Sequence, residues 1–266
     1  MKIQPLTLAD LPDIDDLQPE GWPSILPHIQ VYLSSPFCLP LKVCVDSTTV
    51  GIGTTIYHGD VAWLAHIIVH PDYRNQGIGK LITRTLVDQI KSSPCKTIYL
   101  IATDLGAPVY SKVGFETEIE YLFFKDLELS TPQELSEFVV PYSPQLKSQI
   151  FAMDRLTTGE DRTAHIESHL AGSFAYVQEE KVQGYYLPGF GEGTIIARCP
   201  HAGLELIKLR LKTSKNASFP IENLTATDFL NNLGFKEFKR AKRMRLGEKR
   251  DWLPKNLYNR TGGNIG

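Results

Sequence analysis

One short segment of the sequence combines glycine, positive charge and the start of a helix, as an anion-binding site requires. Residues 69–81 place Arg74, Gly77, Gly79 and Lys80 between an apolar run and a helical pattern. The first backbone amides of a helix have no intrahelical acceptor, and the helix dipole adds positive potential there. A glycine without a side chain also lets a ligand approach the backbone closely. The segment therefore predicts a loop that binds a pyrophosphate.

Two familiar nucleotide-binding loops do not fit this segment. A Walker loop needs Ser or Thr after its lysine, whereas Leu81 follows Lys80 here. A dinucleotide fingerprint needs a third glycine within a parallel strand–helix–strand unit, but Ile82 stands three residues after Gly79. The runs before the loop predict an antiparallel meander instead, and both nucleotide interpretations are excluded on this context.

The elements that must position the loop can be predicted from periodicity and turn signals. A meander of three β-rich runs leads into the loop, and an amphipathic helix with apolar residues at helical spacing follows it. A short apolar strand, a short helix ended by Gly114 and a last strand come next. The expected strands are 41–46, 50–57, 61–69, 97–103 and 117–124, and the expected helices are 78–90 and 107–113.

The loop resembles motif A of the GNAT superfamily of N-acetyltransferases. In that family Arg/Gln-x-x-Gly-x-Gly/Ala follows a strand, and residues 74–79 read Arg-Asn-Gln-Gly-Ile-Gly. The resemblance covers roughly residues 1–126 in the order of elements. It implies an α/β fold with a mixed, mostly antiparallel and splayed sheet flanked by helices. It also implies acetyl-CoA as co-substrate, and no metal site is expected.

The resemblance further implies how acetyl-CoA is bound. Amides of residues 76–80 would hold the pyrophosphate, and the backbone of residues 67–69 would pair with the pantetheine arm in the splay beside strand 97–103. The residues expected to bind acetyl-CoA are Ile67, Ile68, Val69, Arg74, Asn75, Gln76, Gly77, Ile78, Gly79 and Lys80.

Tyr110 is the candidate catalytic acid. It precedes Gly114 and Phe115 in a short helix that matches the family pattern, and the resemblance implies that its hydroxyl protonates the departing thiolate. Such a role suits the chemistry, because attack of an amine on a thioester expels a thiolate that a nearby hydroxyl stabilises. The alternative is a tyrosine that only packs on the core face of its helix.

No general base is evident. Some members of the family carry a Glu six residues before the position of Val69, where this sequence has Trp63. His66 lies on the same strand, but strict alternation points it to the face opposite Val69, so we expect a structural role for it. A water relay or a residue of the second half remains as the source of the base.

The second half of the chain repeats the order of elements of the first. Gly234-Phe235 follows a short helix as Gly114-Phe115 does, and the two pairs lie 120 residues apart. We therefore expect two GNAT-like domains, residues 1–128 and 129–266, with the boundary in the polar stretch 126–134. The second half lacks the glycine loop, and its looser resemblance is to the C-terminal domain of two-domain bacterial acetyltransferases. We expect it to bind acetyl-CoA poorly, and it remains open whether it contributes to the acceptor site.

Acidic and basic residues of the second half allow more than one interpretation. Asp154 and Asp161 are candidates for binding a cationic amine, while helix capping and surface ion pairs are the alternative. The basic run 236–250 is interpreted as a solvated strand edge and not as a nucleic-acid surface.

Composition sets outer limits on function. The chain has 266 residues, 42% hydrophobic residues and a formal charge of −2, which excludes a disordered protein and argues against a nucleic-acid partner. Four separated cysteines predict free thiols. Neither a signal peptide nor a membrane span is predicted, so a cytoplasmic protein without a membrane partner is expected, as a monomer or homodimer.

These observations predict an acetyl-CoA-dependent N-acetyltransferase whose acceptor is an amine of a small or amino-acid-like molecule. The alternative is a non-catalytic acyl-CoA-binding sensor or scaffold, which the missing base keeps open. Turnover separates the two, and acetylation of protein amines remains open because a fold does not fix the acceptor.

Overall fold

The computed structural model describes residues 1–129 and 134–266 and contains two compact units. The first unit comprises residues 1–116, 244–248 and 263–265, and the second comprises 117–243, 249–262 and 266. The chain therefore leaves the first unit at residue 116 and returns to it twice, which differs from the predicted division at 128/129. Residues 130–133 of the predicted boundary stretch lie outside the described residues.

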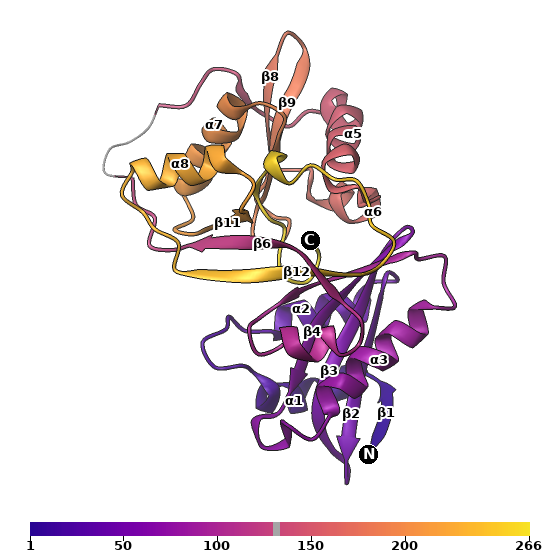
Figure 1. Cartoon of the computed structure of the whole chain (residues 1–266). Helices are drawn as coiled ribbons and strands as arrows, with labels where there is room; N and C mark the ends of the chain where they lie inside the picture. Colours follow the sequence, from indigo (N-terminus) through magenta and orange to yellow (C-terminus); the bar gives the residue numbers. More distant parts are fainter. Residues whose placement is uncertain (130–133) are drawn as a thin grey trace. The chain divides into compact units, whose positions relative to one another are not determined.

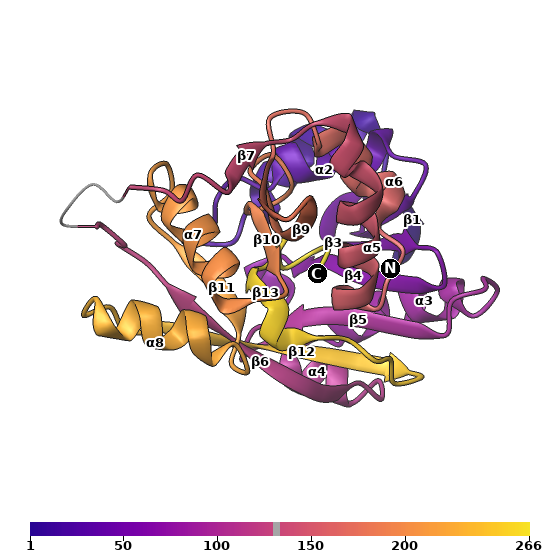
Figure 2. The ribbon, with the colours of Figure 1, turned by 90° about the horizontal axis from the view of Figure 1, so that it is seen from above.

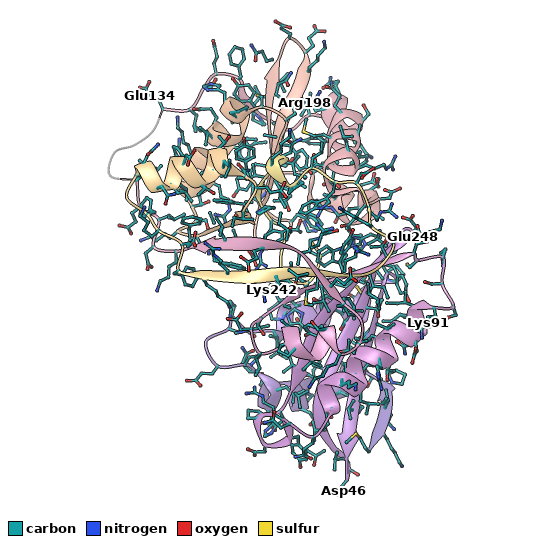
Figure 3. The ribbon with its side chains drawn as sticks, in the orientation of Figure 1. Asp46, Lys91, Glu134, Arg198, Lys242 and Glu248 are labelled. Atoms are coloured by element: carbon teal, nitrogen blue, oxygen red, sulfur yellow. The ribbon has the colours of Figure 1, made fainter. Side chains whose placement is uncertain are left out.

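A mixed sheet forms the centre of the first unit (Figure 1). Its order is β1-β2-β3-β4-β5, in which the neighbours from β1 to β4 are antiparallel and β4 and β5 are parallel. The strands are β1 (Lys2–Pro5), β2 (Cys38–Val45), β3 (Thr48–His58), β4 (Val61–Val69) and β5 (Thr97–Ala102). Asp46 lies at the tip of the β2–β3 hairpin (Figure 3), where it has a left-handed backbone with φ 46°.

Helices cover the sheet of the first unit with two separate apolar cores. One core includes Ile82 and Leu86 of α3, and the other includes Ile29 of α2 together with Trp63 of β4. The helices are α1 (Leu11–Ile14), α2 (Leu26–Ser34), α3 (Ile78–Ile90) and α4 (Ala107–Ser111). Residues 244–247 of β12 (Lys239–Gly247) join this unit, and Met244 is buried in its core.

Two glycines of β3 allow α3 to approach the sheet closely. A Cβ placed on Gly53 would lie 2.6 Å from Cγ2 of Ile82, and one on Gly51 would lie 3.0 Å from Cδ1 of the same residue. Any side chain at Gly53 would overlap with the helix. These glycines therefore set the distance between α3 and the sheet. They thereby also set the position of the loop that precedes the helix.

Two irregularities open the sheet near the end of β4. β4 pairs with β5 only through Val61–Trp63 and Thr97–Tyr99, although both strands continue beyond this point. In the β3–β4 ladder, Thr54 pairs with Ala65 and Ile52 pairs with Ile68, so residues 66 and 67 both face the single residue between 52 and 54. Such an insertion is a β-bulge, which bends a strand and redirects its side chains. The parallel pair splays as the resemblance implies, and the bulge adds a feature that the sequence did not predict.

The second unit contains a five-stranded antiparallel sheet of order β13-β10-β9-β8-β7 (Figure 2). These strands are β7 (Val139–Pro141), β8 (Phe174–Gln178), β9 (Lys181–Leu187), β10 (Thr194–Ala197) and β13 (Leu257–Asn259). A further pair is formed by β6 (Glu116–Phe124) and β11 (Ala217–Pro220). The helices are α5 (Lys147–Thr158), α6 (Thr163–Ile166), α7 (Pro200–Leu211) and α8 (Leu224–Asn232).

The interpretation of residues 236–250 as a solvated edge is wrong in part. Lys242 and Glu248 mark the basic segment in Figure 3. Within the second unit Arg243 is 2% exposed, and its guanidinium lies 3.1 Å from a carboxylate oxygen of Glu118 and 3.5 Å from one of Glu160. The adjacent Arg243 and Met244 are both buried, so this part of the basic segment is not a solvated edge.

Candidate functional site

The segment before α3 presents a run of free backbone amides. The first hydrogen bond of the helix runs from the amide of Leu81 to the carbonyl of Gly77 at 2.9 Å. Among the described residues, no backbone acceptor lies within hydrogen-bonding distance of the amides of 75–80. These donors lie at the positive end of a 13-residue helix. The arrangement can bind an anion through main-chain hydrogen bonds.

Space around the two glycines of the loop is open. Gly77 has a left-handed φ of 84°, and a Cβ there would meet nothing within 4 Å. A Cβ on Gly79 would meet only Val69 at 3.8 Å and Val109 at 3.9 Å, which are ordinary contacts. The left-handed backbone thus explains why residue 77 is a glycine. Packing within the chain does not explain why residue 79 is one. The free space beside Gly79 fits a site where a ligand approaches the backbone.

The side chains of Arg74, Asn75 and Gln76 are exposed at the surface of the loop. Arg74 donates from Nε to the carbonyl of Val69 at 3.2 Å, and Gln76 donates from Nε2 to the carbonyl of Asp72 at 3.2 Å. Asn75 has a left-handed φ of 61°. Lys80 is half-buried, while the side chain of Ile78 is 1% exposed, so Ile78 can contribute only its amide.

The strand expected to pair with pantetheine leads directly into this loop. Ile68 is 5% exposed and faces the core under α2, while Ile67 and Val69 pack against the core under α3. Their side chains are therefore occupied on both faces of β4. The main chain remains the part that can serve a ligand, on the side where β4 and β5 splay apart.

Tyr110 lies on α4, close to the start of α3. The contact that a Cβ on Gly79 would make with Val109 shows that the two helices meet there. Tyr110 is 9% exposed, and its ring packs edge-on against Phe115 with centroids 6.2 Å apart. Burial raises the pKa of its hydroxyl to about 12, so the hydroxyl keeps its proton at neutral pH. The residue both packs in the core and can act as a proton donor.

At the position where some members of the GNAT family have a glutamate, this chain has a buried core residue. Trp63 is fully buried, and its ring packs against Tyr99 with centroids 5.3 Å apart. The indole side chain cannot take up a proton, so the source of the base stays open.

His66 occupies the bulge of β4 in surroundings that the sequence interpretation missed. Its backbone is left-handed with φ 46°, and its ring lies among His28, Tyr32 and Trp22, with centroids 5.2, 5.5 and 6.4 Å away. Burial, followed by the nearby His28, lowers the pKa of His66 to about 4. The spacing of His28 and Tyr32, four residues apart on one helix, was the signal that could have indicated this cluster.

Asp154 is a member of a buried ion pair in the second unit. It is 1% exposed, and its carboxylate accepts from Nε and Nη2 of Arg162 at 3.1 and 2.6 Å and from the hydroxyl of Tyr185 at 2.5 Å. All of these partners are buried, so the carboxylate is already neutralised inside the second unit. These contacts match the ion-pair alternative, and the substrate role of Asp154 stays a prediction.

Asp161 differs from Asp154 in exposure. Its side chain is half exposed, accepts from Arg155 at 2.9 Å and caps the turn at Thr163. The hydroxyl of Thr163 and the guanidinium of Arg155 lower the pKa of Asp161 against the effect of burial. These contacts match the capping and ion-pair alternative, and its substrate role stays a prediction.

The described part of the chain has neither a metal-ligand cluster nor a membrane-spanning helix. Within residues 1–129 and 134–266, no group of three or more His, Cys, Asp or Glu side chains is arranged to hold a metal ion. No helix in these same ranges has the length and apolar character needed to cross a bilayer. The four cysteines are free thiols, as predicted.

Sequence comparisons match the first unit to acetyltransferases. The family described as an acetyltransferase (GNAT) domain matches residues 41–117, which include the loop and Tyr110. An uncharacterized N-acetyltransferase, ycf52, of Pyropia yezoensis is 31% identical over 75 residues, or 28% of this chain and 43% of that protein. Its counterpart in Porphyra purpurea is 32% identical over 73 residues, 26% of this chain and 42% of that protein. The chain thus spans less than half the length of these curated relatives.

Solved structures resemble the whole chain. A putative acetyltransferase from Pyrococcus horikoshii has a TM-score of 0.82 at 22% identity, covering 100% of this chain and 95% of that one. A tandem GNAT protein from the clavulanic acid biosynthesis pathway has a TM-score of 0.61 at 13% identity, covering 94% and 99%. At these identities the likeness concerns the fold. It confirms the predicted fold class of two helix-flanked sheets of GNAT type.

Proposed function

We propose that this chain, whose residues 41–117 match the acetyltransferase (GNAT) domain family, transfers an acetyl group from acetyl-CoA to the amine of a small molecule. The observation that supports the proposal most is the loop before α3. Its unpaired amides, its left-handed Gly77 and the open space at Gly79 together offer a site for a diphosphate. The second unit lacks such a loop in its sequence, so acetyl-CoA binding is assigned to the first unit.

The residues of the chain support the transfer in separate ways. Amides of residues 76–80 hold the diphosphate, and the backbone of Ile67–Val69 aligns the pantetheine arm where β4 and β5 separate. When bound, acetyl-CoA supplies the activated acyl group. Holding this group beside an amine supplies much of the rate, because the two reactants meet in one orientation. Tyr110 keeps its hydroxyl proton at neutral pH and gives it to the leaving sulfur, while the proton lost by the attacking amine passes to water.

A turnover assay on the full-length chain tests this proposal. Release of free thiol from acetyl-CoA would be followed with a panel of amines: amino acids, amino sugars, aryl amines and polyamines, with peptides as the protein-type arm. Tyr110→Phe should lower kcat about 100-fold, while the Kd for acetyl-CoA stays within a factor of about two. Tyr57→Phe, at a half-buried tyrosine of the same unit, is the matched control and should keep kcat unchanged.

One observation favours a second candidate function, a non-catalytic acyl-CoA sensor. The position of a family carboxylate holds the fully buried Trp63. A sensor would bind acetyl-CoA with the same dependence on the loop but would release no thiol with any amine. Acetyl-CoA binding without turnover over the whole panel would therefore favour the sensor, whereas failure to bind would contradict both candidates.

A further inference from the structure

The bulge of β4 gives His66 a backbone conformation that differs from that of an ordinary strand residue. Residues 66 and 67 share one place in the β3–β4 ladder, and His66 takes the left-handed conformation that makes this possible. A left-handed histidine is uncommon and persists where its surroundings hold it. His66 is half-buried, and its ring lies against His28 and Tyr32 of α2, three residues beyond the point where β4 stops pairing with β5.

A chain of two hydrogen bonds holds the ring of His66. The side-chain amide of Asn264 donates from Nδ2 to the hydroxyl oxygen of Tyr32 at 2.6 Å. The same hydroxyl lies 2.8 Å from Nδ1 of His66. Asn264 belongs to residues 263–265, which return to the first unit, and its neighbour Ile265 packs on the core under α2.

With Asn264 as the donor to Tyr32, these two bonds assign one tautomer to His66. The hydroxyl of Tyr32 accepts from Asn264, and its single hydrogen is left to donate to Nδ1 of His66. Burial raises the pKa of Tyr32 far above its usual value, so the hydroxyl keeps this hydrogen. A neutral imidazole that accepts at Nδ1 carries its own proton on Nε2. The remaining ring nitrogen is thus a donor.

We propose that His66 offers its Nε2–H to the acceptor substrate, and that Tyr32 and Asn264 are positioning residues that maintain this tautomer. The inference rests on the proposed function for the identity of the ligand, but the tautomer itself does not. The titratable neighbours of His66 are His28 and Tyr32, with Trp22 on another side, and none of them is acidic at neutral pH. An acceptor held by this group presents an oxygen or an uncharged nitrogen to it, so an amine beside a carboxylate or carbonyl group fits better than a polyamine.

Nitrogen-detected NMR of histidine in the full-length chain at pH 7.5 tests the tautomer directly. The wild type should show His66 with its proton on Nε2, assigned by its loss in His66→Asn. Asn264→Asp is the decisive variant, because a carboxylate at this position accepts the hydroxyl hydrogen of Tyr32. The hydroxyl oxygen must then accept from His66, and the proton should move to Nδ1.

Two variants separate this effect from a general disturbance of the fold. Ile265→Ala loosens the same segment without touching the hydrogen bonds and should leave the tautomer on Nε2. Asn264→Asp combined with Tyr32→Phe removes the connecting hydroxyl, so the shift to Nδ1 should disappear. A wild-type proton on Nδ1, or the same tautomer in the wild type and a folded Asn264→Asp variant, would overturn the inference.

Kinetics add a readout for the substrate. With an amine found in the turnover panel, Asn264→Asp should raise the KM for that amine at least 5-fold and leave the Kd for acetyl-CoA unchanged. An unchanged KM together with the predicted change of tautomer would refute the contact between His66 and the acceptor. If no amine is acetylated, the proposed function fails while the NMR result still decides the role of Tyr32 and Asn264.

Discussion

At the scale of single residues, Gly79 is a position where a substitution should weaken the binding of acetyl-CoA without lowering the stability of the fold. Its Cβ would make only ordinary contacts, and alanine is a better helix former by up to ~1 kcal/mol. Gly79→Ala should therefore unfold at the same or a slightly higher temperature, but it should bind acetyl-CoA at least ~10-fold more weakly, because the methyl group occupies the approach to the amides. Thermal melts and calorimetry measure both quantities.

A matched substitution lies on the same helix. Gln89 is exposed near the far end of α3, so Gln89→Ala should change helix stability by less than ~0.5 kcal/mol and leave the affinity for acetyl-CoA unchanged. Equal affinity of Gly79→Ala and the wild type would show that the ligand does not approach the backbone at this residue.

His66 makes stability depend on pH. Burial lowers its pKa from 6.5 to about 4, so between these values the unfolded chain binds more protons than the folded one. The free energy of unfolding should be constant above pH 6.5 and fall as the pH decreases toward 4, by at most ~3 kcal/mol from this group. Urea unfolding at pH 7 and pH 5 measures the difference.

His66→Asn suits the left-handed backbone and cannot titrate, so it serves as the control. Its pH dependence between 5 and 7 should be smaller than that of the wild type, with a residual part from His169, whose pKa burial also lowers. The same slope in both proteins would contradict a lowered pKa at His66.

At the scale of elements, the buried pair of Asp154 and Arg162 links α5 to the start of α6. Removal of one partner leaves the other charge unpaired in the interior, which typically costs about 3–5 kcal/mol. Asp154→Asn should therefore lower the unfolding free energy strongly and leave the affinity for acetyl-CoA unchanged at a temperature where the variant is folded. Chemical denaturation and calorimetry provide the two measurements.

The exposed pair of Arg155 and Asp161 is the comparison for this element. Its partners are 61% and 50% exposed, and Asp161→Asn keeps a side chain that can cap the turn, so we expect a loss of at most ~1 kcal/mol. A variant of Asp154 as stable as that of Asp161 would contradict the structural role. If instead Asp154→Asn left stability intact and raised the KM for an amine, the substrate role predicted from sequence would be restored.

The elements themselves could largely be predicted from the sequence, because periodicity and turn residues are local signals. β4 has the predicted bounds 61–69, and the helix after the loop spans 78–90 as predicted. The bulge at His66 could not be predicted, since it depends on how β3 pairs with β4. The same is true of Asp154, whose buried partners Arg162 and Tyr185 come from separate segments. The loop was predictable because its chemistry lies within a few consecutive residues.

At the scale of the whole molecule, the first unit is completed by segments from far along the chain. Met244 is buried in its core, and the hydroxyl of Thr97 donates to the carbonyl of Glu248 at 2.8 Å. A Cβ on Gly247 would lie 2.2 Å from the carbonyl oxygen of Lys96, which shows how closely the returning strand approaches. No local sequence pattern indicates this return.

The fragment 1–128 should therefore be much less stable than the first unit of the intact chain, although its length matches the predicted domain. Loss of residues 244–248 and 263–265 exposes the core around Met244 and the packing site of Ile265. Circular dichroism melts of the fragment and of the full chain measure the difference. A version of the fragment joined to residues 239–266 by a flexible linker should regain stability, and equal melting of fragment and full chain would contradict this account.

The central claim is that main-chain amides at the start of α3 bind the diphosphate of acetyl-CoA. Calorimetric titration of the full-length chain with acetyl-CoA and with acetyl-pantetheine, which lacks the diphosphate, tests it most directly. Binding of acetyl-CoA with an affinity at least ~100-fold above that of acetyl-pantetheine is the predicted result, equivalent to about 2.7 kcal/mol. Equal affinity for the two compounds, or no binding of acetyl-CoA, would contradict the claim.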